Sequence, residues 1–137
     1  MDRRVLVDSS ALVALFHRRD QNHRRASRTW KALVSARSLL MVPDYVMGEV
    51  VTYFKRFSFE GCRTAASRLT AFQAAGVIEA VCPEWADWEA ALSGVLAVSD
   101  PGYTLFDAVT VAVATREEIK TIFSYDRVFA DLGFPSP

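Results

Sequence analysis

The chain has 137 residues, of which 51% are hydrophobic, and its sixteen basic side chains balance sixteen acidic ones. This length and composition predict one globular domain, residues 1–137, that can bury a full core. Polar residues at positions 8–10 interrupt the apolar start, which argues against a signal peptide or a membrane span, so we expect a soluble cytoplasmic protein with no membrane partner. The sequence has no glycine-rich phosphate loop, no cysteine and histidine cluster, and no plausible serine, histidine and aspartate set.

Short apolar runs alternate with helical patterns along the chain. The apolar runs predict strands at residues 4–7, 38–42, 77–81 and 120–124. Amphipathic spacing and cap residues predict helices at residues 11–17, 22–36, 45–57, 61–75, 84–98, 104–115 and 126–132. Strands separated by helices predict an α/β fold of three layers, with a parallel sheet of four to five strands covered by helices on both faces.

Several single residues are expected to mark helix ends. Asp44 and Thr104 are expected as N-caps, because their side-chain oxygens can accept from free N–H groups of the first turn. Gly76 is expected as the C-terminal cap of the helix before it. Gly48 lies in mid-helix, where glycine is about 1 kcal/mol less favourable than alanine, which suggests close packing there or an ordinary tolerated glycine.

Four acidic residues are expected at one edge of the predicted sheet. Asp8 directly follows the first strand, and Asp126 follows the fourth strand by one residue. Glu49 lies in the second turn of its helix, and Asp107 is the third residue of its own. In a parallel sheet, strand ends and the helix starts that follow them meet at one edge, where ligands bind. The sequence therefore predicts that these four side chains share a site.

The chemistry of the four acids favours a hard metal ion. Asp8 and Asp107 lie in segments expected to be buried, where an unpaired charge costs several kcal/mol unless it finds a cation. No lysine or arginine lies between Leu69 and Thr115, so Asp107 lacks a local ion pair. Oxygen ligands without imidazole or thiolate suit Mg²⁺ or Mn²⁺. Because such a metal activates water and stabilises charge on a phosphoryl group, we expect phosphodiester hydrolysis.

Each acid also has a simpler structural explanation. Asp8 and Asp126 could cap the helices that follow them, and Asp107 could interact favourably with a helix dipole. Glu49 has the weakest such explanation, because it lies past the first turn on a face expected to be packed. Ser9 could hydrogen-bond the phosphate or a water on the metal, although helix capping explains it equally well.

The balanced net charge conceals a division at Gly76. Residues 1–76 carry thirteen Lys and Arg against six Asp and Glu (13 − 6 = +7), and the remainder carries three against ten (3 − 10 = −7). A cluster of arginines could follow the phosphates of RNA, although a solvated helix face is a slightly better explanation. The candidate RNA-binding residues in this cluster are Arg18, Arg19, Arg24, Arg25 and Arg28.

Other notable side chains are expected to have structural roles. Asp100 precedes a proline and is interpreted as a turn former. The two histidines, His17 and His23, are expected to be solvated. The three tryptophans lie on apolar helix faces and are expected to make core or dimer contacts; they are Trp30, Trp85 and Trp88. Two cysteines without metal-ligand spacing are expected to be reduced thiols; they are Cys62 and Cys82.

Four segments around the acids together resemble a known family. Residues 5–12, 42–50, 105–108 and 123–129 are similar, in this order and spacing, to the acidic segments of PIN-domain ribonucleases. The similarity is greatest to the VapC-type toxins of bacterial toxin-antitoxin pairs. No single segment is specific, but the set extends over nearly the whole chain.

The resemblance implies properties that the residues alone do not. It implies a sheet ordered 3-2-1-4-5, RNA cleavage dependent on Mg²⁺ or Mn²⁺ held by the four acids, a homodimer, and a cognate antitoxin whose tail enters the acidic pocket. Residues 134–137 leave little room for the fifth strand, which we expect to be absent or rudimentary.

The main hypothesis is therefore a metal-dependent endoribonuclease, either the toxin of a toxin-antitoxin pair or a stand-alone nuclease. A receiver-like domain that binds Mg²⁺ and accepts a phosphoryl group is an alternative, because such domains also gather acids at this edge. The residues after the third strand, Cys82 to Glu84, argue against it, since a phosphoacceptor aspartate is expected at the end of a middle strand. An inactive PIN domain that only binds RNA or a protein is the third possibility, and the presence of all four acids argues against it.

Overall fold

A computed structural model describes residues 3–137 and contains one sheet of four parallel strands. The strands are β1 (Arg4–Val7), β2 (Leu39–Pro43), β3 (Ile78–Val81) and β4 (Ile122–Phe123). The helices are α1 (Ser9–Phe16), α2 (His23–Ser35), α3 (Asp44–Lys55), α4 (Phe59–Ala74), α5 (Trp85–Ala97), α6 (Leu105–Arg116) and α7 (Arg127–Asp131). The predicted elements are confirmed, with boundaries that differ by up to about two residues.

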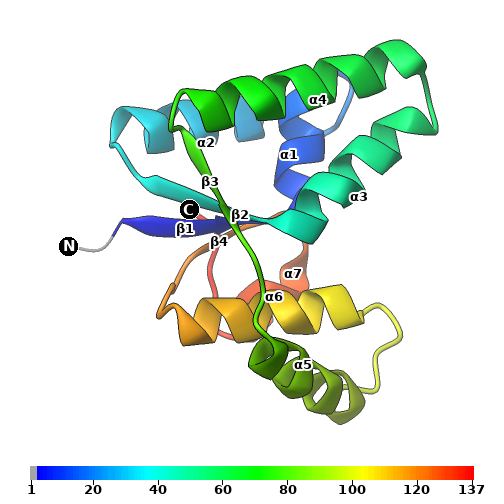
Figure 1. Ribbon diagram of the computed structural model, residues 1–137, viewed down its shortest axis with the longest axis vertical. Helices are drawn as coiled ribbons and strands as arrows, with labels where there is room; N and C mark the ends of the chain where they lie inside the picture. The colour runs from blue at the N-terminus through cyan, green and yellow to red at the C-terminus, as the bar shows by residue number, and fades with distance from the viewer. Residues whose placement is uncertain (1–2) are drawn as a thin grey trace.

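Helices cover both faces of the sheet, as the alternation of elements predicts (Figure 1). Helices α1 to α4 lie over one face, and α5 to α7 lie over the other. Alternate residues of β1 enter the two cores: Val5 and Val7 pack under α1 to α4, whereas Leu6 packs with Val113 and Phe129 on the opposite face. The three-layer α/β architecture predicted from the sequence is confirmed.

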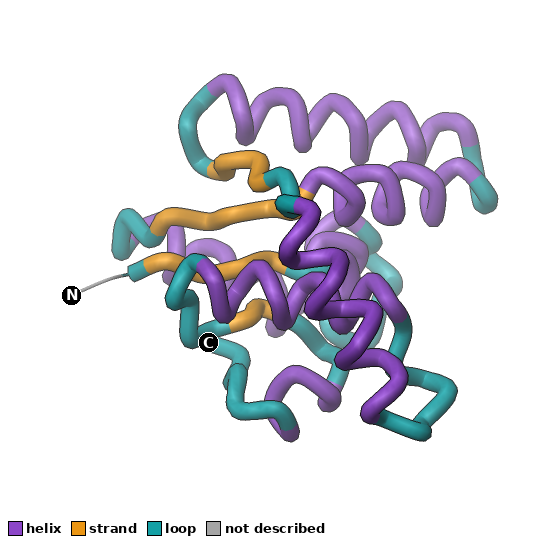
Figure 2. Tube along the Cα trace, turned by 60° about the horizontal axis from the view of Figure 1, so that its bottom comes forward, coloured by secondary structure: helices purple, strands orange, loops and turns teal. Residues whose placement is uncertain are grey.

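The strand order is β3-β2-β1-β4, and each neighbouring pair is parallel. Figure 2 shows the strands side by side. This is the order implied by the resemblance, without its fifth strand. In place of that strand, the C-terminal segment makes a backbone hydrogen bond from Ile122 N–H to the Pro135 carbonyl, at 3.2 Å. The expectation of an absent or rudimentary fifth strand is confirmed. Strand β4 is shorter than predicted, and Leu6 and Val7 of β1 are its register partners.

The helix caps agree with the predictions at two of three positions. Thr104 is the N-cap of α6, and its Oγ1 accepts from Asp107 N–H at 3.1 Å. Gly76 has a positive φ of 71° at the end of α4, a conformation that favours glycine. The prediction for Asp44 was wrong by one residue: Pro43 is the N-cap, and Asp44 is the first residue of α3. The backbone of Pro43 turns directly from β2 into the helix and leaves no linker.

The suggestion of close packing at Gly48 was wrong. Gly48 is exposed, and a Cβ built on it would meet no atom within 4 Å. It is therefore a tolerated glycine on the open face of α3. The proposed solvation of the histidines was also wrong, because both are half-buried: the ring of His17 packs on Phe54, and His23 Nδ1 lies 2.8 Å from the Ala14 carbonyl oxygen.

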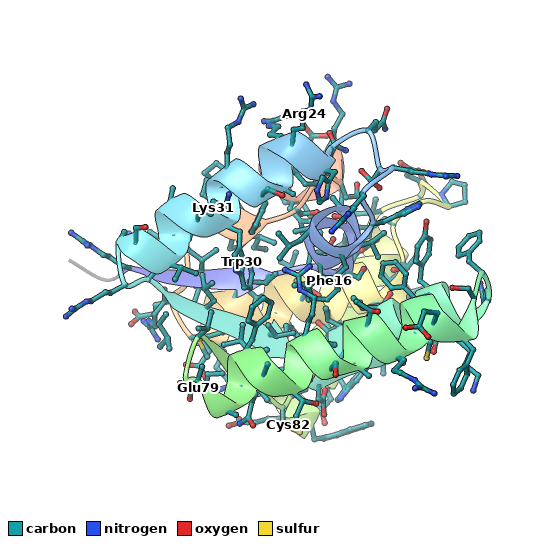
Figure 3. The ribbon with its side chains drawn as sticks, turned by 90° about the horizontal axis from the view of Figure 1, so that it is seen from above. Phe16, Arg24, Trp30, Lys31, Glu79 and Cys82 are labelled. Atoms are coloured by element: carbon teal, nitrogen blue, oxygen red, sulfur yellow. The ribbon has the colours of Figure 1, made fainter. Side chains whose placement is uncertain are left out.

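The three tryptophans occupy different environments. Trp30 is a core residue between α2 and α4 (Figure 3), where it packs on Phe72 with ring centroids 5.0 Å apart. Trp88 is half-buried on α5, whereas Trp85 is exposed. No helix within residues 3–137 has the length and apolar character needed to cross a membrane.

Candidate active site

The four acids identified in the sequence line one cavity of about 240 Å³ at the carboxyl edge of the sheet, which we call the acid cavity. Asp8 follows β1, and Asp126 follows β4 and caps α7. Asp107 lies in the first turn of α6 and Glu49 in the second turn of α3. Ser9 also lines the acid cavity. The structure thus brings together side chains that are up to 118 residues apart in the sequence (126 − 8), while their roles stay a prediction.

Asp8 is the most deeply placed acid, with 8% of its surface exposed. Its Oδ2 accepts hydrogen bonds from the Ser124 hydroxyl at 2.8 Å and the Ser10 hydroxyl at 3.0 Å. Burial raises the pKa of Asp8, the two serine hydroxyls lower it, and the charge of Asp107 raises it further. The side chain makes no capping hydrogen bond to α1. Helix capping therefore does not explain its carboxylate.

Asp107 is half-buried and has a structural contact as well. Its Oδ2 accepts from Thr104 N–H at 2.9 Å, so the two residues form a capping box. Burial raises the pKa of Asp107, the contacts with Thr104 lower it, and the nearby Asp126 raises it. Asp107 thus stabilises the start of α6, in line with its simpler structural explanation. That role does not account for the nearby carboxylate of Asp126.

Glu49 and Asp126 are the other two acids that line the acid cavity. Burial, followed by the charges of Asp8 and Asp107, raises the pKa of Glu49 to about 7. Asp126 is exposed, and its Oδ1 accepts from Val128 N–H at 3.2 Å, so the capping explanation is correct for one of its oxygens. The other oxygen has no capping role in α7.

The acid cavity contains negative charge without a protein cation. No lysine or arginine lines it, and among residues 3–137 the salt bridges involve Arg4 and Arg116 rather than any of the four acids. In this described part of the chain, no three possible ligands already lie at metal-ligand spacing. The serine hydroxyls bind Oδ2 of Asp8 and the Thr104 N–H binds Oδ2 of Asp107, so these hydrogen bonds leave the second oxygen of each carboxylate for a ligand. The donor set, carboxylate and hydroxyl oxygen, fits a hard divalent cation.

A larger groove of about 730 Å³, which we call the aromatic groove, adjoins the acid cavity. The two share four lining residues, so one opens beside the other; these are Ser9, Ser10, Glu49 and Phe106. One face of α3 forms much of the wall of the aromatic groove. The residues of α3 and its C-cap that line it are Tyr45, Gly48, Glu49, Thr52, Tyr53 and Arg56.

One of the five arginines predicted to bind RNA borders this region. Arg25 lines a separate cavity of about 270 Å³ together with Asp126 and Arg127. The remaining four are exposed away from the cavities described here, and Figure 3 shows Arg24 at the outer side of α2; they are Arg18, Arg19, Arg24 and Arg28.

Sequence reasoning missed two arginines near the site, Arg56 and Arg127. Arg56 lines the aromatic groove, and it lies seven residues after Glu49. This spacing places both on one helix face, which is a signal that the sequence carried. Arg127 directly follows Asp126 and lines the cavity that Arg25 also lines.

Comparison with known proteins identifies the family and the fold of the chain. The PIN domain family matches residues 5–135, so the chain belongs to the PIN domain family. A crystal structure of Mycobacterium tuberculosis VapC20, a Sarcin-Ricin loop cleaving toxin, has a TM-score of 0.82 to this chain at 24% identity, covering 97% of this chain and 98% of that one. At 24% identity, this similarity shows that the two proteins share a fold. No curated protein sequence matches the chain.

The strand order also decides against the receiver-like alternative. Receiver domains have the order 2-1-3-4-5, in which the first strand lies between the second and third. Here β1 lies between β2 and β4, and β3 is at the edge of the sheet. The fold is therefore PIN-like rather than receiver-like.

Proposed function

We propose that this protein is an endoribonuclease dependent on Mg²⁺ or Mn²⁺ and the toxin of a toxin-antitoxin pair. The observation that carries the proposal is the acid cavity: four carboxylates of a PIN-domain chain surround one space without a lysine or arginine. The description of VapC20 as a Sarcin-Ricin loop cleaving toxin supports the same interpretation. The whole chain, residues 1–137, acts as one domain in this proposal.

The residues around the acid cavity have three kinds of role in the proposed reaction. Asp8, Glu49, Asp107 and Asp126 hold the cation, which when bound activates water and offsets charge on the phosphodiester. The hydroxyls of Ser10 and Ser124 orient the Asp8 carboxylate. Ser9 lines both the acid cavity and the aromatic groove, where its hydroxyl can donate to a phosphate oxygen.

Cleavage of total cellular RNA by the purified protein tests the activity. We expect discrete fragments with Mg²⁺ or Mn²⁺, none with EDTA, and a loss of about 100-fold or more for Asp107→Asn. Asn keeps an oxygen that can accept from Thr104 N–H, so the substitution removes mainly the charge. Asp131→Asn, an exposed change at the end of α7, is the matched control and should cleave as the wild type does.

Metal binding is measured separately from activity. Because a ligand that binds only the folded state stabilises it, Mn²⁺ should raise the Tm of the wild type and of Asp131→Asn, but raise that of Asp107→Asn much less. A metal-dependent Tm without RNA cleavage would favour the inactive PIN domain. Equal Tm shifts in all three proteins would contradict the proposed metal site.

Arginines of the predicted cluster are proposed to guide the RNA backbone. Replacing the five with glutamine should reduce the salt dependence of RNA binding, by about one in log–log slope for each phosphate that an arginine neutralises in the wild type. Arg63→Gln on α4, outside the cluster, is the control. An unchanged slope for the five-residue variant would show that these arginines are only a solvated surface.

The proposal also includes a cytoplasmic location, a homodimer and a cognate antitoxin. A small neighbouring reading frame encoding a DNA-binding protein that blocks cleavage would support the toxin. If purified product of that frame leaves cleavage unchanged, the protein is better described as a stand-alone nuclease.

A further inference from the structure

Phe106 is an exposed aromatic side chain at the boundary of the two cavities. It directly precedes Asp107 in the first turn of α6, and 45% of its surface is exposed. Phe106 lines both the acid cavity and the aromatic groove. An exposed ring at this point lies beside any phosphodiester that approaches the acids.

Contacts with neighbouring side chains hold the Phe106 ring in place. Tyr45 stacks against it with ring centroids 5.4 Å apart and planes 29° apart, and the Trp88 ring meets it edge-on at 6.5 Å. The Thr110 hydroxyl donates to the Phe106 carbonyl at 2.8 Å, so the Tyr45 hydroxyl donates to Thr110 Oγ1. These contacts fix the position of the stack before any ligand binds, which reduces the entropy lost on binding.

The aromatic groove, which Phe106 lines, also contains neutral polar side chains. Asn22 is the N-cap of α2, yet its side chain makes no capping hydrogen bond. Together with Thr52 and Tyr53 it gives the aromatic groove an amide and two hydroxyls. Such groups can pair with the edge of a nucleobase whose face lies on an aromatic ring.

We propose that Phe106 is a stacking platform for the base next to the phosphodiester that is cleaved. The inference rests on the proposed ribonuclease function and assigns a base-positioning residue to that site. Bases in single strands are free to stack on aromatic side chains, whereas bases inside a duplex are not. Phe106 acts as a positioning residue, because it holds the substrate rather than the reacting atoms.

The choice of RNA over a protein occupant follows from the location of the ring. Phe106 lines both the acid cavity and the aromatic groove, so an occupant of both that reacts at the acids presents a flat apolar surface next to its phosphodiester. A single-stranded nucleotide has both. Besides charged residues, the aromatic groove contains the Asn22 amide and the Thr52 and Tyr53 hydroxyls, which suit base edges.

Binding of short fluorescent poly(A) RNA, measured by anisotropy in EDTA at low salt, tests the platform. A ribose-phosphate strand of the same length without bases is the second probe. Phe106→Leu should weaken poly(A) binding by about 5- to 150-fold, the effect expected for one stacked base, and leave binding of the baseless strand unchanged. Phe106→Trp should restore the affinity.

Phe59→Leu is the matched control, because Phe59 is exposed at the start of α4 and lines neither cavity. In Mg²⁺, the cleavage of poly(A) by Phe106→Leu should show a raised KM that Phe106→Trp corrects, and Mn²⁺ should shift the Tm as in the wild type.

Two outcomes would contradict different claims. A wild type that binds RNA, with a Phe106→Leu variant that binds poly(A) equally well, would overturn the stacking proposal and leave a protein contact as the role of the ring. A wild type that binds neither probe in EDTA and cleaves no RNA in Mg²⁺ or Mn²⁺ would contradict the proposed ribonuclease function itself.

Discussion

Individual carboxylates in the acid cavity combine structural and chemical demands. Asp107 supplies one oxygen to a capping box and Asp126 one to the start of α7, while each keeps another oxygen for a ligand. Asp8 instead relies on two serine hydroxyls that stabilise its charge. Amide substitutions are therefore more informative than alanine here, since an amide oxygen preserves the caps.

Glu49 should make the stability of the metal-free protein depend on pH. Its pKa is about 7, above the ordinary value of 4.5, so between these values the folded state binds more protons than the unfolded state. The free energy of unfolding therefore falls as pH rises through this window. Glu49→Gln removes the ionisation, so its Tm in EDTA should exceed that of the wild type at about pH 8 and match it at about pH 4.

The control for this prediction is Glu60→Gln, an exposed carboxylate in the first turn of α4. It should show no gain in Tm at the higher pH. Because Glu49 is only half-buried, water screens part of its penalty, and the gain is expected to be modest. A Glu49→Gln difference that is constant across the pH range would show that shape, not charge, is responsible.

At the scale of elements, an ion pair joins α6 to a second capping box, at the start of α5. Asp87 caps the start of α5, and its two oxygens accept from Arg116 Nε at 3.0 Å, while Arg116 Nη2 lies 2.9 Å from Oδ2. Burial alone would raise the pKa of Asp87, but the hydrogen bonds from Arg116 and Glu84 N–H lower it overall. With 3% of its surface exposed, Asp87 depends on this partner.

Arg116→Met should therefore destabilise the protein by about 3 kcal/mol at neutral pH, because it leaves a buried carboxylate without its cation. Since the pKa of Asp87 is lowered in the folded state, the stabilisation is lost as pH falls through that pKa, and the difference should shrink in acid. Urea unfolding at several pH values measures it. Lys120→Met, an exposed change, should have little effect, and an equally small effect of Arg116→Met would refute the buried pair.

At the scale of the whole molecule, the charge division in the sequence becomes a division between layers. The basic residues 1–76 form β1, β2 and helices α1 to α4, whereas the acidic remainder includes α5 to α7 on the opposite face of the sheet (Figure 1). The aromatic groove lies mainly on the basic side, along α3 and the α1–α2 turn. Its location suits an approach of RNA from that layer.

The homodimer stays a prediction, and α5 offers a surface for it. Trp85, Leu92 and Leu96 recur at helical spacing on this helix and are exposed, Leu96 by 86%. A charge in a paired apolar face is strongly unfavourable, so Leu96→Glu should convert a dimer to monomer in sedimentation equilibrium. Phe59→Glu on α4 is the control. A dimer unaffected by Leu96→Glu would place the interface elsewhere.

The sequence by itself determined the elements and the edge at which the acids meet. Periodicity and caps are local signals, and parallel strands with helical crossovers have few possible arrangements, so Asp8 and Asp107 could be assigned to one edge. Helix boundaries at Asp44 and the environment of Gly48 were less predictable, because a shift of one residue depends on how the helix packs.

Only the tertiary structure decided the contacts that give these residues their chemistry. The hydroxyl that orients Asp8 belongs to Ser124, 116 residues away, and the cation that stabilises Asp87 belongs to Arg116 on the next helix. The raised pKa of Glu49 and the exposed ring of Phe106 likewise depend on burial and on neighbours from other elements. Electrostatic and stacking energies vary with distances of a few ångströms, and those distances are set by packing rather than by local sequence.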